Sequence, residues 1–315
     1  MSESSMPSPA APVVGGDPGD LGDPRVGKAL DRRRWLGRVR GPAARPIWRQ
    51  PVVVVAGTVV IAWLLLALFA PLVAPHDPLA LDGEAYSPPS GEHPFGTDEL
   101  GRDILSRVIY GARLSIPLAL AVVVLALSIG GLLGLLAGYL GRGVDDVVMR
   151  VTDLVFAFPQ IILAMAVTAT FGPSTRNAVL ALVVVSWPVY ARVIRSAVLT
   201  IRGADYLYAS RLLGVGPWTA LRRDVVPNSV GPAVVLATLE LGNAVLMLAA
   251  LSFLGLGPRP PAAEWGAMIA LGSNDLSMWW VSVFPGLAIL TVVLAFNLLG
   301  DALRDRLDPR YARGR

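Results

Sequence analysis

The chain has 315 residues, of which 54% are hydrophobic and 16% are charged, and its mean hydropathy is +0.59. A soluble domain of this length cannot bury so much apolar surface, so the composition indicates an all-α polytopic membrane protein. The absence of cysteine excludes disulfide frameworks, thiolate metal sites and cysteine nucleophiles. His76 and His93 lie near acidic residues, but neither has a second histidine at ligand spacing, so no metal site is expected.

Residues 1–46 are rich in Pro, Gly, Ser and Asp, and then in Arg, with too little apolar content to form a core. They are interpreted as a disordered cytoplasmic tail. The run Arg32–Trp35 resembles a twin-arginine export signal, but the uncharged stretch that follows, Pro51–Ala74, is 24 residues long. A signal-peptide core has roughly 7 to 15 residues, so residues 47–75 are predicted to be an uncleaved first membrane helix.

Apolar stretches of about 20 residues, the length that crosses the hydrocarbon core, predict six transmembrane helices. The predicted spans are Pro51–Ala74, Leu114–Leu140, Leu154–Gly172, Asn177–Ser196, Ser229–Gly257 and Met278–Gly300. The fourth is the weakest because Arg192 and Arg195 shorten its uncharged run, although long arginine side chains can reach the membrane interface. Five residues within spans, Pro117, Gly130, Gly131, Gly134 and Pro159, are interpreted as marks of close helix packing and kinks.

The distribution of basic residues predicts the orientation. With the N-terminus in the cytoplasm, 22 of the 27 Lys and Arg residues fall on the cytoplasmic side and five fall outside. This bias follows the positive-inside rule, so both termini, including the tail 305–315, are expected in the cytoplasm of a bacterial cell. Residues 76–113 then form an extracytoplasmic loop, either a solvated connector or a docking surface with an interfacial helix at Gly101–Tyr110. That helix would place Arg102, Arg107 and Arg113 near lipid headgroups.

The cytoplasmic segment 203–228, named here the coupling segment, is polar but has strong helix signals. Asp205–Leu213 combines helix formers with an acidic first turn, and Gly214–Pro217 supplies a C-cap and a turn. Trp218–Asp224 is predicted to form a second short helix that Pro227 ends. The segment is either a helix-turn-helix that docks to a partner or an ordinary loop.

The coupling segment also contains an Ala-small pair, a nearby glycine and, about ten residues later, an apolar-x-Pro sequence. The residues of this pattern are Asp205, Tyr208, Ala209, Ser210, Gly214, Val225 and Pro227. The pattern resembles the cytoplasmic "EAA" loop of membrane subunits of binding-protein-dependent ABC importers. Further stretches resemble the C-type permease subunit of the dipeptide and oligopeptide group: HPFGTDELGRDILSRVIYGARLS (93–115), SWPVYARVIRSAVL (186–199), LSFLGLG (251–257), EWGAMIA (264–270) and FPGLAILTVVLAFNLLGDALRDRLDPR (284–310).

The resemblance implies a type I importer permease fold, with residues 114–304 as the permease domain and the coupling segment docked on an ATPase subunit. It implies four kinds of partner: a second homologous permease, two ATP-binding subunits, an extracytoplasmic substrate-binding protein and the lipid bilayer. The chain has no GxxxxGK[ST] phosphate loop, and its only lysine is Lys28. ATP and Mg²⁺ are therefore expected on partner subunits, so the chain itself is not expected to be an enzyme, to hold a cofactor or to bind nucleic acid.

Three positions depart from the family pattern. The loop's usual Glu is Tyr208 and its second Ala is Ser210, while Leu248 stands where such subunits commonly have a Glu in the fifth span. Glu240 is instead the acidic residue deep in a predicted span, and Asn243 lies one turn further on a similar face. A buried carboxylate indicates function, so Glu240 is interpreted as lining the transport pathway or as a contact with the second permease, unless it lies nearer the membrane interface than the span suggests.

Two other classes of membrane protein place requirements on the spans. An ion-coupled secondary transporter needs several polar groups within its spans or an internal repeat, and a membrane hydrolase needs a base near its nucleophile. The spans contain one deep carboxylate and no histidine, which favours the importer. The sequence leaves the cargo open among dipeptides, oligopeptides, nickel chelates and modified sugars.

Overall fold

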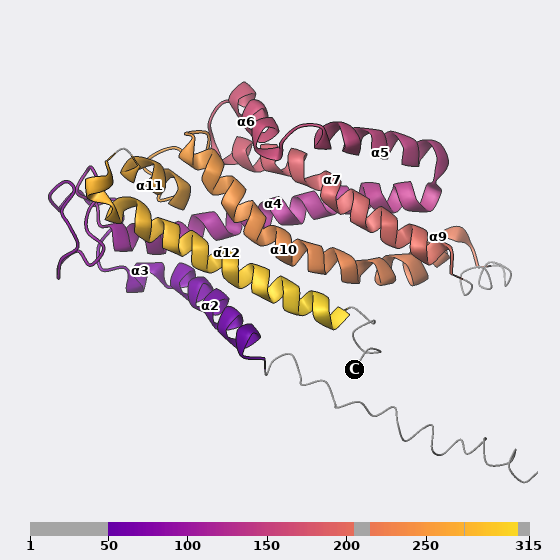
Figure 1. The fold of residues 1–315 in the computed structure, drawn as a ribbon, viewed down its shortest axis with the longest axis horizontal. Helices are drawn as coiled ribbons and strands as arrows, with labels where there is room; N and C mark the ends of the chain where they lie inside the picture. Colours follow the sequence, from indigo (N-terminus) through magenta and orange to yellow (C-terminus); the bar gives the residue numbers. More distant parts are fainter. Residues whose placement is uncertain (1–49, 205–214, 274, 308–315) are drawn as a thin grey trace, which may run out of the picture. The chain divides into compact units, whose positions relative to one another are not determined.

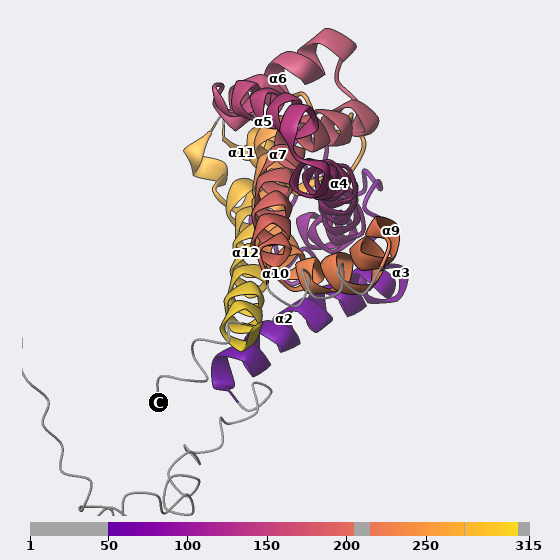
Figure 2. The ribbon, with the colours of Figure 1, turned by 90° about the vertical axis from the view of Figure 1, so that its right-hand side faces the viewer.

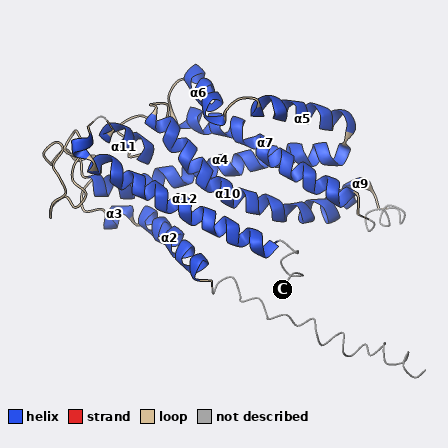
Figure 3. Cartoon of the chain, in the orientation of Figure 1, coloured by secondary structure: helices blue, strands red, loops and turns tan. Residues whose placement is uncertain are grey.

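The computed structural model describes residues 50–204, 215–273 and 275–307, and within these ranges every regular element is a helix (Figure 3). The described residues belong to one unit, residues 46–315, whereas the expected tail 1–46 lies outside them. The described fold is therefore helical, as the composition predicts.

Among the described residues, five helical runs are long and apolar enough to cross a membrane, and Figure 1 shows how their helices are arranged. They contain α2 (Pro51–Leu68), α4 (Ile104–Leu140), α7 (Thr175–Arg202), α10 (Val226–Phe253) and α12 (Trp280–Leu307). On α2, exposed apolar side chains occur along most of the helix, as expected for a surface that faces lipid. Four of the six predicted spans thus have a close helical counterpart, and the second begins earlier than predicted.

The third predicted span, Leu154–Gly172, is not one straight helix. It is divided between α5 (Arg142–Phe156) and α6 (Gln160–Phe171), which meet at an angle of 92°. Pro159 stands at the break with an extended backbone, and its ring removes a hydrogen-bond donor that a continuous helix would need. The break lies at Pro159, where a kink was expected, but it divides the predicted span into two helices, which count as a sixth span if the pair crosses the membrane as a bent unit.

The second span begins ten residues before the predicted Leu114. The side chain of Asp103 caps α4 by accepting a hydrogen bond of 2.7 Å from the backbone N–H of Ser106. The helix then continues to Leu140 with Pro117 inside it. The predicted separate interfacial helix at Gly101–Tyr110 is therefore wrong, because most of those residues form the first turns of the spanning helix.

Helix α4 packs along α7, and α10 contacts α4, α7 and α12 (Figures 1 and 2). Gly130 and Gly134 allow the close approach of α4 to α7: a β-carbon on Gly134 would lie 2.9 Å from the Cα of Ala191, and one on Gly130 would lie 2.9 Å from the Cβ of Tyr190. The prediction that these glycines mark close packing is confirmed. Between α10 and α12 lie the short helices α11 (Trp265–Gly272) and η4 (Leu276–Met278).

Candidate functional site

The coupling segment is described up to residue 204 and again from residue 215. Its predicted contact residues Asp205, Tyr208, Ala209, Ser210 and Gly214 lie outside the described residues. From residue 217 the backbone forms α9 (Pro217–Ala220), the π-helix η3 (Leu221–Val225) and then α10. The segment thus enters the membrane-spanning helix directly, in a helical run from Trp218 to Phe253.

Pro227 does not end a helix, so that prediction is wrong. Pro227 is the second residue of α10, but the helical run Trp218–Phe253 continues through it, so the run lacks one backbone donor there. The wider π-helical turn of η3 precedes it and changes the backbone where the proline ring would meet the carbonyl four residues earlier. The coupling segment is thereby continuous with the spanning helix rather than hinged from it.

Val225 anchors this end of α10 inside the protein. It is fully buried in an apolar cluster that joins η3 and α10 to α7. The buried residues of this cluster are Ile194, Val198, Leu221, Val225 and Ala233. Trp218, by contrast, is 68% exposed, and Pro227 is also exposed. Val225 therefore acts in packing the segment onto α7, whereas Trp218 presents a large apolar surface to the outside.

Two ion pairs join α5 to α7, and the sequence reading missed both. The Nη2 atom of Arg192 donates to Oδ1 of Asp153 at 2.7 Å, and the guanidinium of Arg195 binds both carboxylate oxygens of Asp145. From the sequence, Arg192 and Arg195 are expected only to reach the membrane interface. Because the partners are about 40 to 50 residues away in the chain, only the folded packing of α5 against α7 reveals them.

Glu240 and Asn243 are joined on α10, as their spacing predicts. The Nδ2 atom of Asn243 donates to Oε2 of Glu240 at 3.1 Å, and both side chains are partly exposed in this chain alone. Gly242 between them approaches α12, where a β-carbon would lie 2.9 Å from Oδ1 of Asn297. Among the described residues no basic side chain forms an ion pair with Glu240. Within the described part of the chain, the contact that holds this carboxylate is the hydrogen bond from Asn243.

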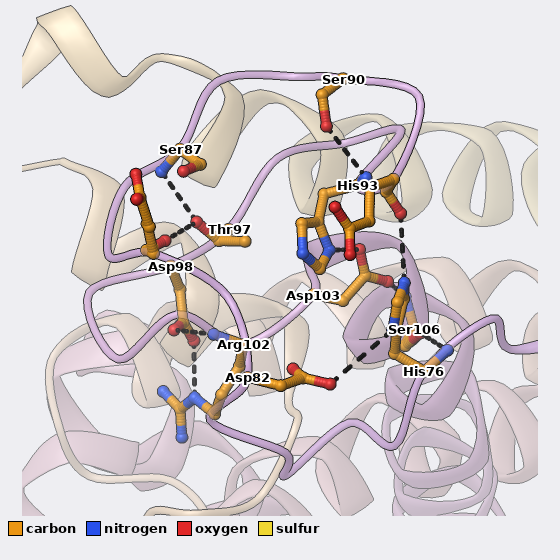
Figure 4. Close-up of polar contacts among 12 residues, drawn as sticks. His76, Asp82, Ser87, Ser90, His93, Thr97, Asp98, Arg102, Asp103 and Ser106 are labelled. Carbon is orange, nitrogen blue, oxygen red and sulfur yellow. Dashed lines mark hydrogen bonds and ion pairs between the residues drawn. The ribbon is translucent and has the colours of Figure 1, made fainter.

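The segment between α2 and α4 forms a polar network around buried Asp98 (Figure 4). The Nε atom of Arg102 donates to Oδ2 of Asp98 at 2.7 Å, and Nε of Arg107 lies 3.5 Å from the same oxygen. Arg102 and Arg107 are 4% and 3% exposed. The prediction that these two arginines reach lipid headgroups is therefore wrong, because both are buried in the protein.

The same segment brings the two histidines together. Their ring centroids lie 4.7 Å apart, and Nδ1 of His93 lies 3.1 Å from Oδ1 of Asp103. Ligand-capable atoms of His76, His93 and Asp103 all lie within 4.8 Å of one another. The cluster was not predicted because His76 and His93 are 17 residues apart in the chain and meet only where the segment folds back on itself.

Glu264 forms a second buried polar group, outside the spanning helices. It caps α11 by accepting a 2.9 Å hydrogen bond from the N–H of Ala267, and Oγ of Ser115 on α4 lies 3.4 Å from its other oxygen. Glu264 is 1% exposed, and this burial raises the pKa of its carboxyl above its usual range. The residue joins the segment between α10 and α11 to α4.

A comparison with protein families identifies the arrangement. The family described as binding-protein-dependent transport system inner membrane component matches residues 130–313, more than half of the chain. The chain belongs to this family. A second model, the N-terminal TM domain of oligopeptide transport permease C, matches residues 43–89. Family membership confirms the resemblance, makes the chain a multi-pass inner-membrane component of a transport system with other subunits, and favours the importer over an ion-coupled secondary transporter.

Several transport permeases are similar in sequence to this chain over most of its length. A probable D,D-dipeptide transport system permease protein of Escherichia coli is 43% identical over 278 residues, covering 87% of this chain and 93% of that protein. A di/tripeptide transport system permease protein of Pseudomonas aeruginosa is 48% identical over 252 residues, covering 78% and 83%. A dipeptide transport system permease protein of Alkalihalophilus pseudofirmus is 40% identical over 270 residues, covering 85% and 89%.

Proposed function

We propose that the chain is one of two permease subunits of an ATP-driven importer of dipeptides or short oligopeptides. The choice of peptides as the cargo rests on relatives at 40% to 48% identity, whose names specify D,D-dipeptide, dipeptide and di/tripeptide transport. Their similarity extends over more than three-quarters of this chain, so it includes the spanning helices and not the coupling segment alone. Peptides are therefore favoured over nickel chelates and modified sugars.

The proposed assembly contains a second homologous permease, two ATP-binding subunits and an extracytoplasmic substrate-binding protein. The family's description as a binding-protein-dependent system supports the last of these partners. Because the chain has no phosphate loop, ATP and Mg²⁺ would be held by the ATP-binding subunits. The chain would then supply half of the translocation pathway and no catalytic residue.

The continuous helical run Trp218–Phe253 supports the coupling role of segment 203–228. A movement of the segment reaches Glu240 and Asn243 because they lie on the same run. Val225 extends the effect to α7 through the buried apolar cluster. In the proposed cycle, closure of the ATP-binding subunits moves the segment, and α10 and α7 move with it.

Glu240 is proposed to line the pathway and to recognise a cationic group of the cargo, such as a peptide's amino terminus. Its partial exposure and its hydrogen bond from Asn243 support this role, since a carboxylate held in place by an amide can bind an ammonium group. Leu248, where the resemblance to such subunits leads us to expect a carboxylate, is fully buried. In this subunit the negatively charged group of the pathway would thus be Glu240, eight residues before Leu248 on α10.

The orientation with both termini in the cytoplasm remains part of the proposal. The start of α2, the junction of α4 with α5, α9 and the end of α12 lie toward one end of the helices, and α11 lies toward the other (Figure 1). The end with α9 is proposed to be cytoplasmic because arginines are concentrated in the segments that leave it.

The coupling role is tested by Gly214→Val in the intact importer. A branched side chain on a docking surface overpacks it, at a cost of about 1 to 3 kcal/mol. We expect the variant to insert and to bind the second permease, but to lose the ATP-binding subunits on purification and to lose peptide uptake. The matched control is Gly216→Val, since a β-carbon on Gly216 meets no atom of the described residues within 4 Å.

The substrate-binding protein should keep its affinity for peptide, because it does not contact the coupling segment. Normal uptake together with normal retention of the ATP-binding subunits in Gly214→Val would refute the coupling role of this segment.

A further inference from the structure

Three side chains from separate stretches meet beyond the outer ends of α2 and α4, away from the proposed coupling site (Figure 4). His76 follows the short helix α3 (Ala70–Val73), His93 lies in the connection to α4, and Asp103 is the N-cap of α4. One imidazole nitrogen from each histidine and one carboxylate oxygen lie within 4.8 Å of one another. These are atoms that bind borderline divalent cations such as Zn²⁺.

The His93–Asp103 pair already has a separation that suits two ligands of one metal ion. In a tetrahedral zinc site with bonds of about 2.0–2.1 Å, ligand atoms lie about 3.3 Å apart. The observed distance from Nδ1 of His93 to Oδ1 of Asp103 is 3.1 Å. Only His76 has to approach more closely, and its side chain is 23% exposed, so its ring has room to rotate.

The backbone around all three residues is held by hydrogen bonds of its own, while Nδ1 of His93 bonds Oδ1 of Asp103 and Nε2 of His76 bonds the carbonyl oxygen of Glu92, both at 3.1 Å. A metal ion would replace the first of these two contacts and would bind His76 through Nδ1 or after release of the second. The N–H of His93 donates to Oγ of Ser90 at 3.0 Å, and the N–H of His76 donates to Oγ of Ser106 at 3.0 Å. The second oxygen of Asp103 accepts the N–H of Ser106 at 2.7 Å. Such outer contacts orient metal ligands and raise the affinity of a site.

Charge and access also suit a divalent cation. His93 and Asp103 are 7% and 0% exposed, so the carboxylate supplies a negative charge in a poorly hydrated place. Asp82 is outside this cluster, but its exposed carboxylate has Oδ2 3.9 Å from Nδ1 of His76, so a side-chain movement could bring it in as a fourth ligand that balances the charge of the ion. His76 also lines a cavity of about 670 Å³ beside α3, so an ion in this cavity would meet that ligand of the cluster.

We propose that His76, His93 and Asp103 form a Zn²⁺ site, with Asp82 or water as the fourth ligand. The bound ion would join the residues after α3 to the first turn of α4. It would thereby fix the segment 74–103, which otherwise depends on hydrogen bonds and ion pairs. The site belongs to this chain alone and does not depend on the identity of the cargo.

The test uses the complete importer in lipid nanodiscs, stripped with EDTA and titrated with Zn²⁺ by calorimetry. Asp103→Asn is the decisive variant, because Asn preserves the helix cap while removing the anionic ligand. His76→Gln removes a partly exposed ligand and gives a second measurement if the first variant assembles poorly. Glu99→Gln, an exposed acid of the same segment, is the matched control.

We expect the wild type and Glu99→Gln to bind one more Zn²⁺ per copy of this chain than the other two variants, or to bind it more than about 10-fold more tightly. Co²⁺ substitution should give the absorption of a tetrahedral nitrogen and oxygen site in the wild type, and this absorption should disappear in Asp103→Asn. Equal zinc binding in all four proteins would overturn the proposal and leave a His–Asp hydrogen bond without a metal.

Discussion

Gly134 offers a direct test of the packing between α4 and α7. A β-carbon added there would lie 2.9 Å from the Cα of Ala191, and closer still to the carbonyl oxygen of Ala191. Unstrained carbon–carbon contacts are about 3.5–4.0 Å, so the two helices must separate by about 0.6 to 1 Å. Because the opposing atoms belong to the backbone, a side-chain rotation cannot relieve the contact.

The cost follows from two opposing effects. Overpacking of a well-packed interface costs about 1 to 3 kcal/mol, whereas replacing a helical glycine by alanine recovers up to about 1 kcal/mol. We therefore expect Gly134→Ala to lower the free energy of unfolding by about 1 to 2 kcal/mol. Gly131→Ala is the matched control, since its β-carbon would meet the flexible ends of two side chains, Ile194 at 3.2 Å and Leu127 at 3.9 Å.

The assay is the thermal unfolding midpoint of the purified subunit in one detergent, measured for the wild type and both variants. Gly134→Ala should unfold at a lower temperature than the wild type, and Gly131→Ala at the same or a higher temperature. Equal midpoints for the two variants would refute the close approach of α4 to α7 at this glycine.

Further predictions concern the pathway, the buried carboxyl and the orientation. Glu240→Gln should preserve assembly but reduce uptake of peptides with a free amino terminus more than uptake of N-acetylated peptides, and an equal effect on both would contradict a charge contact. Burial raises the pKa of Glu264, so the folded protein binds a proton at this carboxyl more tightly than the unfolded chain does. The resulting stabilisation of the fold is fully present below the ordinary pKa of 4.5 and is lost as pH rises through the folded-state pKa. Unfolding midpoints from about pH 5 to about pH 9 should therefore fall more steeply in the wild type than in Glu264→Gln, and parallel profiles would exclude this linkage. An impermeant thiol reagent should label Ser273→Cys but not Ser210→Cys in intact cells, and the reverse pattern would invert the proposed topology.

The sequence predicted the helices whose apolar runs are long and uninterrupted, because burial in lipid requires about 20 apolar residues in each span. It failed where a helix is shaped by contacts with distant residues. Pro159 was recognised as a kink, but the 92° bend that divides α5 from α6 was not predicted. The early start of α4 at Ile104 was missed because its first turns contain polar residues that are buried by a folded segment rather than by lipid.

The candidate site was predicted in the same uneven way. Asn243 was paired with Glu240 from their spacing along one helix, and the structure shows that hydrogen bond. The contact of His76 with His93 depends on a chain reversal that leaves no periodic signal. Arg107 was assigned to lipid headgroups because an arginine beside an apolar run usually reaches the interface, yet here Asp98 lies nearby and allows it to be buried.

The most direct test of the account is peptide uptake by proteoliposomes that contain the purified importer with its binding protein outside and ATP inside. The account predicts accumulation of a labelled dipeptide that requires both ATP hydrolysis and this chain, and that persists when ionophores abolish every ion gradient. Accumulation that stops with the ion gradients, or that continues when this chain is omitted, would contradict it.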